Sequence, residues 1–235
     1  EYRFSKDGSG KIILAFFGRG TNEIVPIDVC LLAEAPINAA AKAVLDWLND
    51  NSIPIEILRS LAVRVNEKGS ALAALFVSEE FAFINAPMFG PVLKGLQVYL
   101  LKRRTPNFSE KQLLFSVGDT LLDTELNGLK LKSGVISFSQ VNVPLFKMAL
   151  KDIASFVDNG DKVIDYYSGS GPIGPSVAKK ASEVVLVDNS EESAAIAAEN
   201  IAMNKAENCR FELMPSEKMT DLIDRDKTII FDPPR

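Results

Sequence analysis

The sequence contains no histidine and only two cysteines, Cys30 and Cys209. The cysteines are far apart and form no CxxC pair, so neither a disulfide framework nor a zinc site is expected. Without histidine the chain lacks the most common general base of enzymes. Cys30 stands at the end of an expected strand and Cys209 at the start of one, where a cysteine usually packs as a small hydrophobic residue rather than acting as a nucleophile.

Long apolar runs are missing as well. No stretch approaches the roughly 18 consecutive apolar residues that a membrane span needs, and the first residues show no charged segment leading into an apolar core. Hydrophobic residues make up 47% of the chain and charged residues 24%, as in ordinary soluble proteins. We therefore expect a cytoplasmic protein that does not bind a membrane. We also expect a monomer, and no metal.

Clustered positive charge is scarce. The formal net charge is −5. Positive and negative side chains balance over residues 1–135, so the entire excess of negative charge lies in residues 136–235. An acidic chain argues against nonspecific nucleic-acid binding, which needs clustered cations. The one dense basic run is Lys102, Arg103 and Arg104, which is either a solvated strand end or a set of phosphate contacts for RNA.

The pattern of apolar segments divides the chain into two regions. Over residues 1–133, apolar runs separated by turn motifs predict an α+β, largely antiparallel domain. We expect hairpins over residues 2–17, 58–77 and 121–132, strands over 23–30 and 95–101, and a helix over 36–48. From residue 134 onward, strands alternate with helices, including an amphipathic helix over 143–157 capped by Asn142, which predicts a parallel, doubly wound α/β sheet.

Residues 161–188 are the most informative stretch. An apolar strand leads into Gly169, Gly171 and Gly174, which fit the pattern G-x-G-x-x-G, and a second strand ends at Asp188. This spacing lets a strand turn sharply into a helix while a ligand lies against bare backbone. Asp188 follows Gly169 by 188 − 169 = 19 residues, where a carboxylate can accept the hydroxyls of a ribose. The stretch predicts a nucleoside-bearing cofactor; the simpler alternative is a structural turn.

A fourth strand of the second region, over residues 227–231, ends in Asp232, Pro233, Pro234 and Arg235. Consecutive prolines lack backbone N–H donors and stiffen the chain, which would fix the acid over the cleft. A dinucleotide oxidoreductase has no need of this motif at that place. The arrangement suits a site that handles a planar substrate beside a cofactor.

Several segments together carry a resemblance to a known family: FSQVN (138–142), DYYSGSG (165–171), Val187-Asp188, the helix end ENIAMN (199–204) and DPPR (232–235). The sequence resembles the RNA (uracil-5-)-methyltransferases, which use S-adenosylmethionine to methylate uridine C5 in tRNA or rRNA. The resemblance begins near residue 1 and is strongest over 136–235. It implies an α/β, Rossmann-like S-adenosylmethionine-dependent methyltransferase domain, incomplete over 134–235, behind a central substrate or RNA-binding domain over 1–133.

The same resemblance implies roles for individual residues. Gln140 and Asp232 would border the cofactor and the target base, and Tyr167 with the Gly169–Gly171 loop would hold the methionine and adenosine parts. Asp188 would take the ribose hydroxyls, and Lys102–Arg104 would contact RNA. Two positions depart from the family pattern: Ser168 stands where a cysteine is frequent, and Pro172 replaces a polar residue, so no cofactor contact is expected at 172.

The chemistry of the family needs groups that this sequence does not show. Uracil C5 is a poor nucleophile, so a cysteine thiolate attacks C6 and a base later removes the C5 proton. In the family, that cysteine and a glutamate base follow the DPPR motif. We therefore expect no catalytic residue before Arg235 and an inactive fragment of a longer enzyme. Two alternatives stay open: a non-catalytic RNA-binding or RNA-folding protein that keeps the fold, and a nicotinamide-dependent oxidoreductase.

Overall fold

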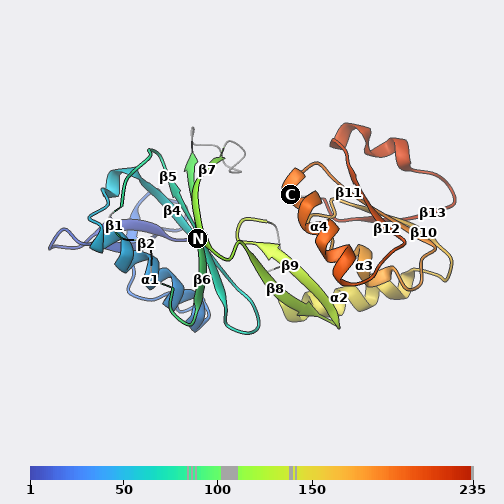
Figure 1. Cartoon of the computed structure of the whole chain (residues 1–235), viewed down its shortest axis with the longest axis horizontal. Coiled ribbons are helices and arrows are strands. Elements are labelled where there is room, and N and C mark those ends of the chain that lie inside the picture. The colour runs from blue at the N-terminus through green and yellow to red at the C-terminus, as the bar shows by residue number, and fades with distance from the viewer. Residues whose placement is uncertain are drawn as a thin grey trace. The chain divides into compact units, whose positions relative to one another are not determined.

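The structure, a computed structural model, describes residues 1–83, 85, 87, 89–101, 111–137, 140 and 142–233. Contacts within the chain divide it into two compact units (Figure 1). Unit 1 comprises Glu1–Leu122 and Gly134–Ile136, and unit 2 comprises Asp123–Ser133 and Ser137–Arg235. Among the described residues, no helix combines the length and the apolar character needed to cross a membrane.

Unit 1 is built on a four-stranded sheet with the order β4-β5-β6-β7. Its strands are β4 (Leu58–Val65), β5 (Ala71–Val77), β6 (Leu93–Leu101) and β7 (Lys111–Gly118). Strand β5 is buried along its whole length, because helix α1 (Ala35–Asp50) belongs to the core on one face and Leu122 and Val135 pack on the other. Its unbroken apolar run is typical of a strand that has no solvated face.

A smaller antiparallel sheet precedes α1 in the chain. It consists of β1 (Arg3–Lys6), β2 (Ile12–Phe17) and β3 (Ile24–Pro26), and a short 3-10 helix, η1 (Ile55–Ile57), comes directly before β4. The Asp7 carboxylate accepts the N–H groups of Ser9 and Lys11 at 2.8 and 3.0 Å. This side-chain bonding closes the turn of the predicted hairpin, as aspartate does in many turns.

Unit 2 contains a parallel sheet with the order β12-β11-β10-β13. Its strands are β10 (Lys162–Tyr166), β11 (Glu183–Asp188), β12 (Cys209–Leu213) and β13 (Lys227–Phe231). Helices α2 (Val143–Phe156), α3 (Gly174–Val177) and α4 (Glu191–Met203) contribute to the core on one face (Figure 1). The 3-10 helix η2 (Ser216–Leu222) places Leu222 on the other face. This arrangement confirms the predicted Rossmann-like α/β fold.

The strand order of unit 2 places a crevice beside β10. The chain moves from β10 to β11 and β12 on one side and then returns to β13 on the other. In a parallel sheet such a reversal opens a crevice at the carboxyl ends of the two strands, which is the usual ligand site of the fold. The functional residues predicted at the ends of β10, β11 and β13 therefore meet at one edge.

The hairpin of β8 (Leu121–Leu126) and β9 (Leu129–Gly134) joins the two regions. Its turn residues Asn127 and Gly128 have φ angles of 52° and 85°, the left-handed conformations that an Asn-Gly turn predicts. From Asp123 to Ser133 the hairpin packs within unit 2. The assignment of residues 1–133 to a substrate domain and 134–235 to a methyltransferase domain stays a prediction about function.

Some local expectations differ from the structure. Strand β3 has three residues rather than eight, because Cys30 is held by α1: the Asn38 side chain bonds both its N–H and its C=O. Strand β7 was not predicted, since its alternation of exposed and partly buried residues is irregular. Strands β5 and β6 are parallel within the otherwise antiparallel unit 1, which the long connection over 78–92 permits.

The core face of α2 is narrower than its apolar pattern predicts. Leu150 is buried, whereas Leu145 and Phe156 are 59% and 81% exposed. The predicted cap is present, since Asn142 Oδ1 accepts the Leu145 N–H at 3.1 Å. Helix α4 is capped in the same way by Ser190.

Candidate cofactor site

The carboxyl edge of the parallel sheet brings three acidic groups together. Asp165 lies within β10, Asp188 ends β11, and Asp232 directly follows β13. The charges of Asp232 and Asp188 both act on the Asp165 carboxyl group. Two acids that the sequence singles out, at 188 and 232, therefore lie near a third at the crevice beside β10.

The glycine loop over residues 168–174 uses its glycines for different purposes. A Cβ atom on Gly171 would lie 2.6 Å from Leu186 Cδ2, and one on Gly174 would lie 2.7 Å from Leu186 Cδ1. A Cβ atom on Gly169 would meet nothing within 4 Å. The second and third glycines thus permit close packing against β11, while the first leaves the loop backbone open to a ligand.

Asp188 is bonded to the loop that it was predicted to accompany. Its Oδ2 atom accepts the Gly169 N–H at 3.0 Å, and its Oδ1 atom accepts the Ser190 N–H at 3.0 Å. Each carboxylate oxygen can accept more than one hydrogen bond, and the residue is only half-buried. The remaining acceptor positions suit the two hydroxyls of a ribose, and the binding of a ribose by Asp188 stays a prediction.

Asp165 is a candidate that sequence reasoning left unassigned. Its side chain is fully buried, and neither carboxylate oxygen receives a hydrogen bond of normal geometry from the described residues. Burial raises the pKa of Asp165 to about 7, the charges of Asp232 and Asp188 add to the rise, and the nearby Gly174 amide opposes it. An unpartnered buried carboxylate is costly, so this group favours a positively charged ligand. In the sequence, the indication of a special role for Asp165 is that it is an acidic residue within an apolar strand.

Three N–H groups of the loop, those of Ser168, Gly169 and Gly171, are already engaged. The Gly169 N–H bonds Asp188, the Gly171 N–H donates to the Ser168 carbonyl at 2.9 Å, and the Ser168 N–H donates to the Val187 carbonyl at 3.1 Å. Phosphate binding at a glycine loop depends on unengaged N–H groups. The surrounding carboxylates would also repel an anion. The site therefore disfavours a pyrophosphate and suits a nucleoside that carries positive charge.

An aromatic pair flanks the same edge. The rings of Tyr167 and Phe231 meet edge to face, with 5.3 Å between their centroids. Tyr167 has a φ angle of 58°, in the left-handed region that non-glycine residues seldom adopt. Phe231 is 60% exposed. The predicted contact of Tyr167 with a cofactor agrees with its place beside the glycine loop and stays a prediction.

The remaining predicted site residues are less fully described. Gln140 is half-buried and precedes the N-terminus of α2, so its contact with cofactor or base stays a prediction. Lys102, Arg103 and Arg104 lie outside the described residues, as do Phe138, Ser139, Val141, Pro234 and Arg235.

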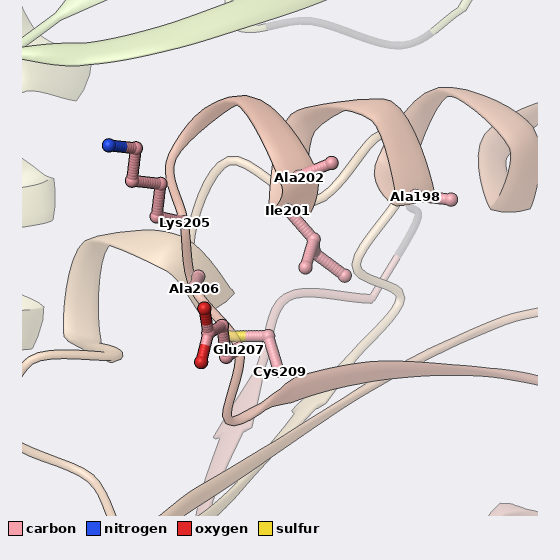
Figure 2. Close-up of a pocket in the computed structure, with 7 residues that line it drawn as sticks. All are labelled: Ala198, Ile201, Ala202, Lys205, Ala206, Glu207 and Cys209. Carbon is pink, nitrogen blue, oxygen red and sulfur yellow. The ribbon is translucent and has the colours of Figure 1, made fainter.

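A surface pocket of about 370 Å³ lies elsewhere in unit 2 (Figure 2). It is lined by Ala198, Ile201, Ala202, Lys205, Ala206, Glu207 and Cys209. Cys209 begins β12, so the pocket lies at the amino edge of the sheet, opposite the glycine loop. Burial raises the pKa of the Cys209 thiol to about 12. This thiol stays protonated at neutral pH and is unsuited to act as a nucleophile.

Comparisons with known proteins agree with this architecture. The family described as "Methyltransferase domain" matches residues 157–232. An uncharacterized RNA methyltransferase of Fusobacterium nucleatum is 29% identical over 248 residues, covering 97% of this chain and 53% of the relative. Another, from Caldanaerobacter subterraneus, is 26% identical over 244 residues, covering 95% and 54%. The chain thus spans about half the length of the curated relatives it matches.

A solved structure shows the same fold. The tRNA (uracil-54, C5)-methyltransferase of Pyrococcus abyssi, in complex with S-adenosyl-L-homocysteine, superposes with a TM-score of 0.74 at 19% identity. The match covers 93% of this chain and 56% of that structure. Unit 2 thus matches a methyltransferase domain, and the chain as a whole is similar, over nearly all of its residues, to proteins named RNA methyltransferases.

Proposed function

We propose that this protein is part of an S-adenosylmethionine-dependent enzyme that methylates uridine C5 in tRNA or rRNA. The observation that carries the cofactor assignment is the buried Asp165 carboxylate, which receives no hydrogen bond of normal geometry, beside a loop in which the N–H groups of Ser168, Gly169 and Gly171 are already bonded. S-adenosylmethionine joins an uncharged adenosine to a sulfonium and an ammonium group. Its positive charges match the acidic edge of the sheet, whereas the pyrophosphate of a nicotinamide cofactor does not.

The residues of the site can divide the binding of this cofactor among them. Asp188 would accept the ribose hydroxyls on the lone pairs that Gly169 and Ser190 leave available. Asp165, although buried, would attract the ammonium group through its charge, and the open backbone at Gly169 would admit the ligand. Tyr167 and Phe231 would exclude water from one side. When bound, the cofactor supplies an electrophilic methyl group.

The target atom that we propose is C5 of uridine. This choice is supported by the order of Gln140, the glycine loop, Asp188 and Asp232, and by the fold shared with a tRNA uracil-C5 methyltransferase. Methylation at C5 requires a thiolate that adds to C6. The Cys209 thiol has a pKa of about 12 and lies at the opposite edge of the sheet, so Cys209 is unsuited to that role.

We also propose that residues 1–133 bind the RNA substrate and that Lys102, Arg103 and Arg104 contact its phosphates. We further propose that the enzyme is monomeric and cytoplasmic. The support is the curated relatives, which are named RNA methyltransferases and align over this region as well as over the methyltransferase domain.

Calorimetry on the full-length protein tests the cofactor assignment. We expect S-adenosylhomocysteine to bind and NADH not to bind, and the reverse result would overturn the proposal. Nucleoside mass spectrometry then tests the reaction, with unmodified tRNA and rRNA incubated with S-adenosylmethionine. We expect 5-methyluridine to form. Cofactor and RNA binding without any product would instead support the non-catalytic RNA-binding alternative.

A further inference from the structure

Asn200 of α4 and Asn204, the C-cap residue of α4, bond the backbone of strand β9 in the way that a neighbouring strand would. Asn204 Oδ1 accepts the Lys130 N–H at 3.0 Å, and its Nδ2 donates to the Lys130 carbonyl at 2.7 Å. Asn200 does the same for Lys132, at 2.7 and 3.1 Å. Residues four apart share a helix face, and residues two apart share a strand face, so the two carboxamides fit alternate residues of β9.

Only Asn200 makes a further bond to the glycine loop. Its Nδ2 also donates to the Ser170 carbonyl at 2.8 Å, and its side chain is 1% exposed. The second bond of Asn204 Nδ2 stays within α4, to the Asn200 carbonyl at 2.7 Å. A carboxamide has two N–H donors, and those of Asn200 are divided between β9 and the loop. Of the two residues, Asn200 alone therefore contacts the glycine loop.

The bond to Ser170 lies at the centre of the loop. Ser170 stands between Gly169, whose N–H bonds Asp188, and Gly171, which packs beneath Leu186 and Ala197. A loop that contains two left-handed glycines has many alternative conformations. Fixing the Ser170 carbonyl restricts that freedom from the side of α4, as Asp188 does from the side of β11.

We propose that Asn200 is a positioning residue that holds the cofactor loop in its binding conformation and couples occupancy of that loop to the β8–β9 hairpin. The inference rests on the proposed function, because it takes the loop as the cofactor site. A ligand that orders the loop strengthens the bond from Asn200 to Ser170 and with it the hold on Lys132. Coupling between two sites is reciprocal, so loosening β9 at Lys132 weakens cofactor binding. Strand β9 continues into Gly134–Ile136, which belongs to unit 1.

Substituting the two asparagines in the full-length protein separates positioning from simple support of the fold. Both Asn200→Ala and Asn204→Ala remove a clamp on β9, but only the first releases Ser170. Calorimetry should show S-adenosylhomocysteine binding about five- to tenfold more weakly for Asn200→Ala, as expected for losing about one hydrogen bond. Asn204→Ala should stay within about twofold of the unmodified protein. Equal affinities of the two variants would overturn the inference.

Hydrogen exchange on the unmodified protein provides a test that does not depend on either variant folding. Saturation with S-adenosylhomocysteine should slow exchange at the Lys132 amide, which Asn200 holds, more than at the Lys130 amide, which Asn204 holds. Equal slowing at both amides, or none at either, would overturn the coupling. If the unmodified protein bound no S-adenosylhomocysteine at all, the proposed function would fail, and this inference with it.

Discussion

The Gly169 N–H donates to the Asp188 carboxylate at 3.0 Å, joining two residues that are 19 positions apart in the chain. The glycine that opens the loop and the acid that ends the next strand therefore form one unit. The bond leaves Asp188 able to accept from a ligand and leaves the Gly169 N–H unable to donate to one. A site of this kind binds hydroxyl groups and positive charge in preference to phosphate.

Replacing Asp188 with asparagine should separate its hydrogen bond to the glycine loop from its proposed hydrogen bonds to a ribose. The amide can accept one hydrogen bond from the loop but cannot offer charged acceptors to both ribose hydroxyls. Affinity for S-adenosylhomocysteine should fall by about ten- to a hundredfold, because hydrogen bonds to charged groups contribute about 1.5–3 kcal/mol. Calorimetry measures the change. Glu183→Gln, at the opposite end of the same strand and paired with Arg210, is the matched control and should bind normally.

Asp165 should make the ligand-free protein less stable as the pH rises. Its folded pKa of about 7 lies above the ordinary value of 3.8, so between these values the folded state binds more protons than the unfolded state. Stability from this group is therefore present near pH 4 and is lost as the pH rises through 7. Asp165→Asn cannot ionise, and at pH 8 it should be more stable than the unmodified protein by on the order of a few kcal/mol.

Urea denaturation at pH 5 and pH 8 checks this expectation. The stability difference between Asp165→Asn and the unmodified protein should be larger at pH 8, and a difference independent of pH would contradict it. The same variant should bind S-adenosylmethionine more weakly, because the amide offers no charge to an ammonium group. A gain in stability with a loss of binding would mark a residue retained for function.

The sequence predicts the parts of the site that depend on local spacing. The positions of Gly169, Gly171 and Asp188 follow from a strand, a turn and a second strand, and the structure places them as that pattern requires. Asp165 could not be assigned in advance, because its significance lies in burial without a partner. Asn200 could not be assigned either, since its partners lie 68 and 30 positions away in the chain.

The same contrast between local sequence pattern and tertiary contacts explains why unit 1 departs from its predicted strands. The segment around Cys30 has the composition of a strand, but its backbone groups bond the side chain of Asn38 instead of a neighbouring strand. Amino-acid composition indicates which side chains can be buried in a strand. The tertiary structure decides whether a neighbouring strand or a side chain satisfies the hydrogen bonds of the backbone.

Alanine at Gly171 should destabilise unit 2 more than alanine at another left-handed glycine. Gly171 has a φ angle of 76°, and its added Cβ would lie 2.6 Å from Leu186 Cδ2. Gly160 has a φ angle of 92° and open space around the added atom. Gly160→Ala should therefore lose only about 1–2 kcal/mol for the left-handed backbone, whereas overlap with Leu186 adds about 1–3 kcal/mol more for Gly171→Ala. Equal losses in chemical denaturation would show that Leu186 moves aside without cost.

Replacing Lys102, Arg103 and Arg104 together with alanine should weaken RNA binding and flatten its dependence on salt. Each phosphate contact that is lost removes about 0.7–0.9 from the slope of log affinity against log salt concentration, because fewer counterions are released on binding. A filter-binding titration of tRNA or rRNA at several salt concentrations measures the slope. If all three residues contact phosphates, the slope should fall by about two to three.

A second triple variant separates phosphate contact from net charge. Lys11, Lys42 and Lys68 are exposed lysines of unit 1, and their replacement with alanine removes the same total charge. Long-range attraction is largely screened at physiological ionic strength, so the control variant should keep the original slope. If both triple variants changed the slope equally, only total charge would matter, and an unchanged slope in the first would make residues 102–104 an ordinary solvated surface.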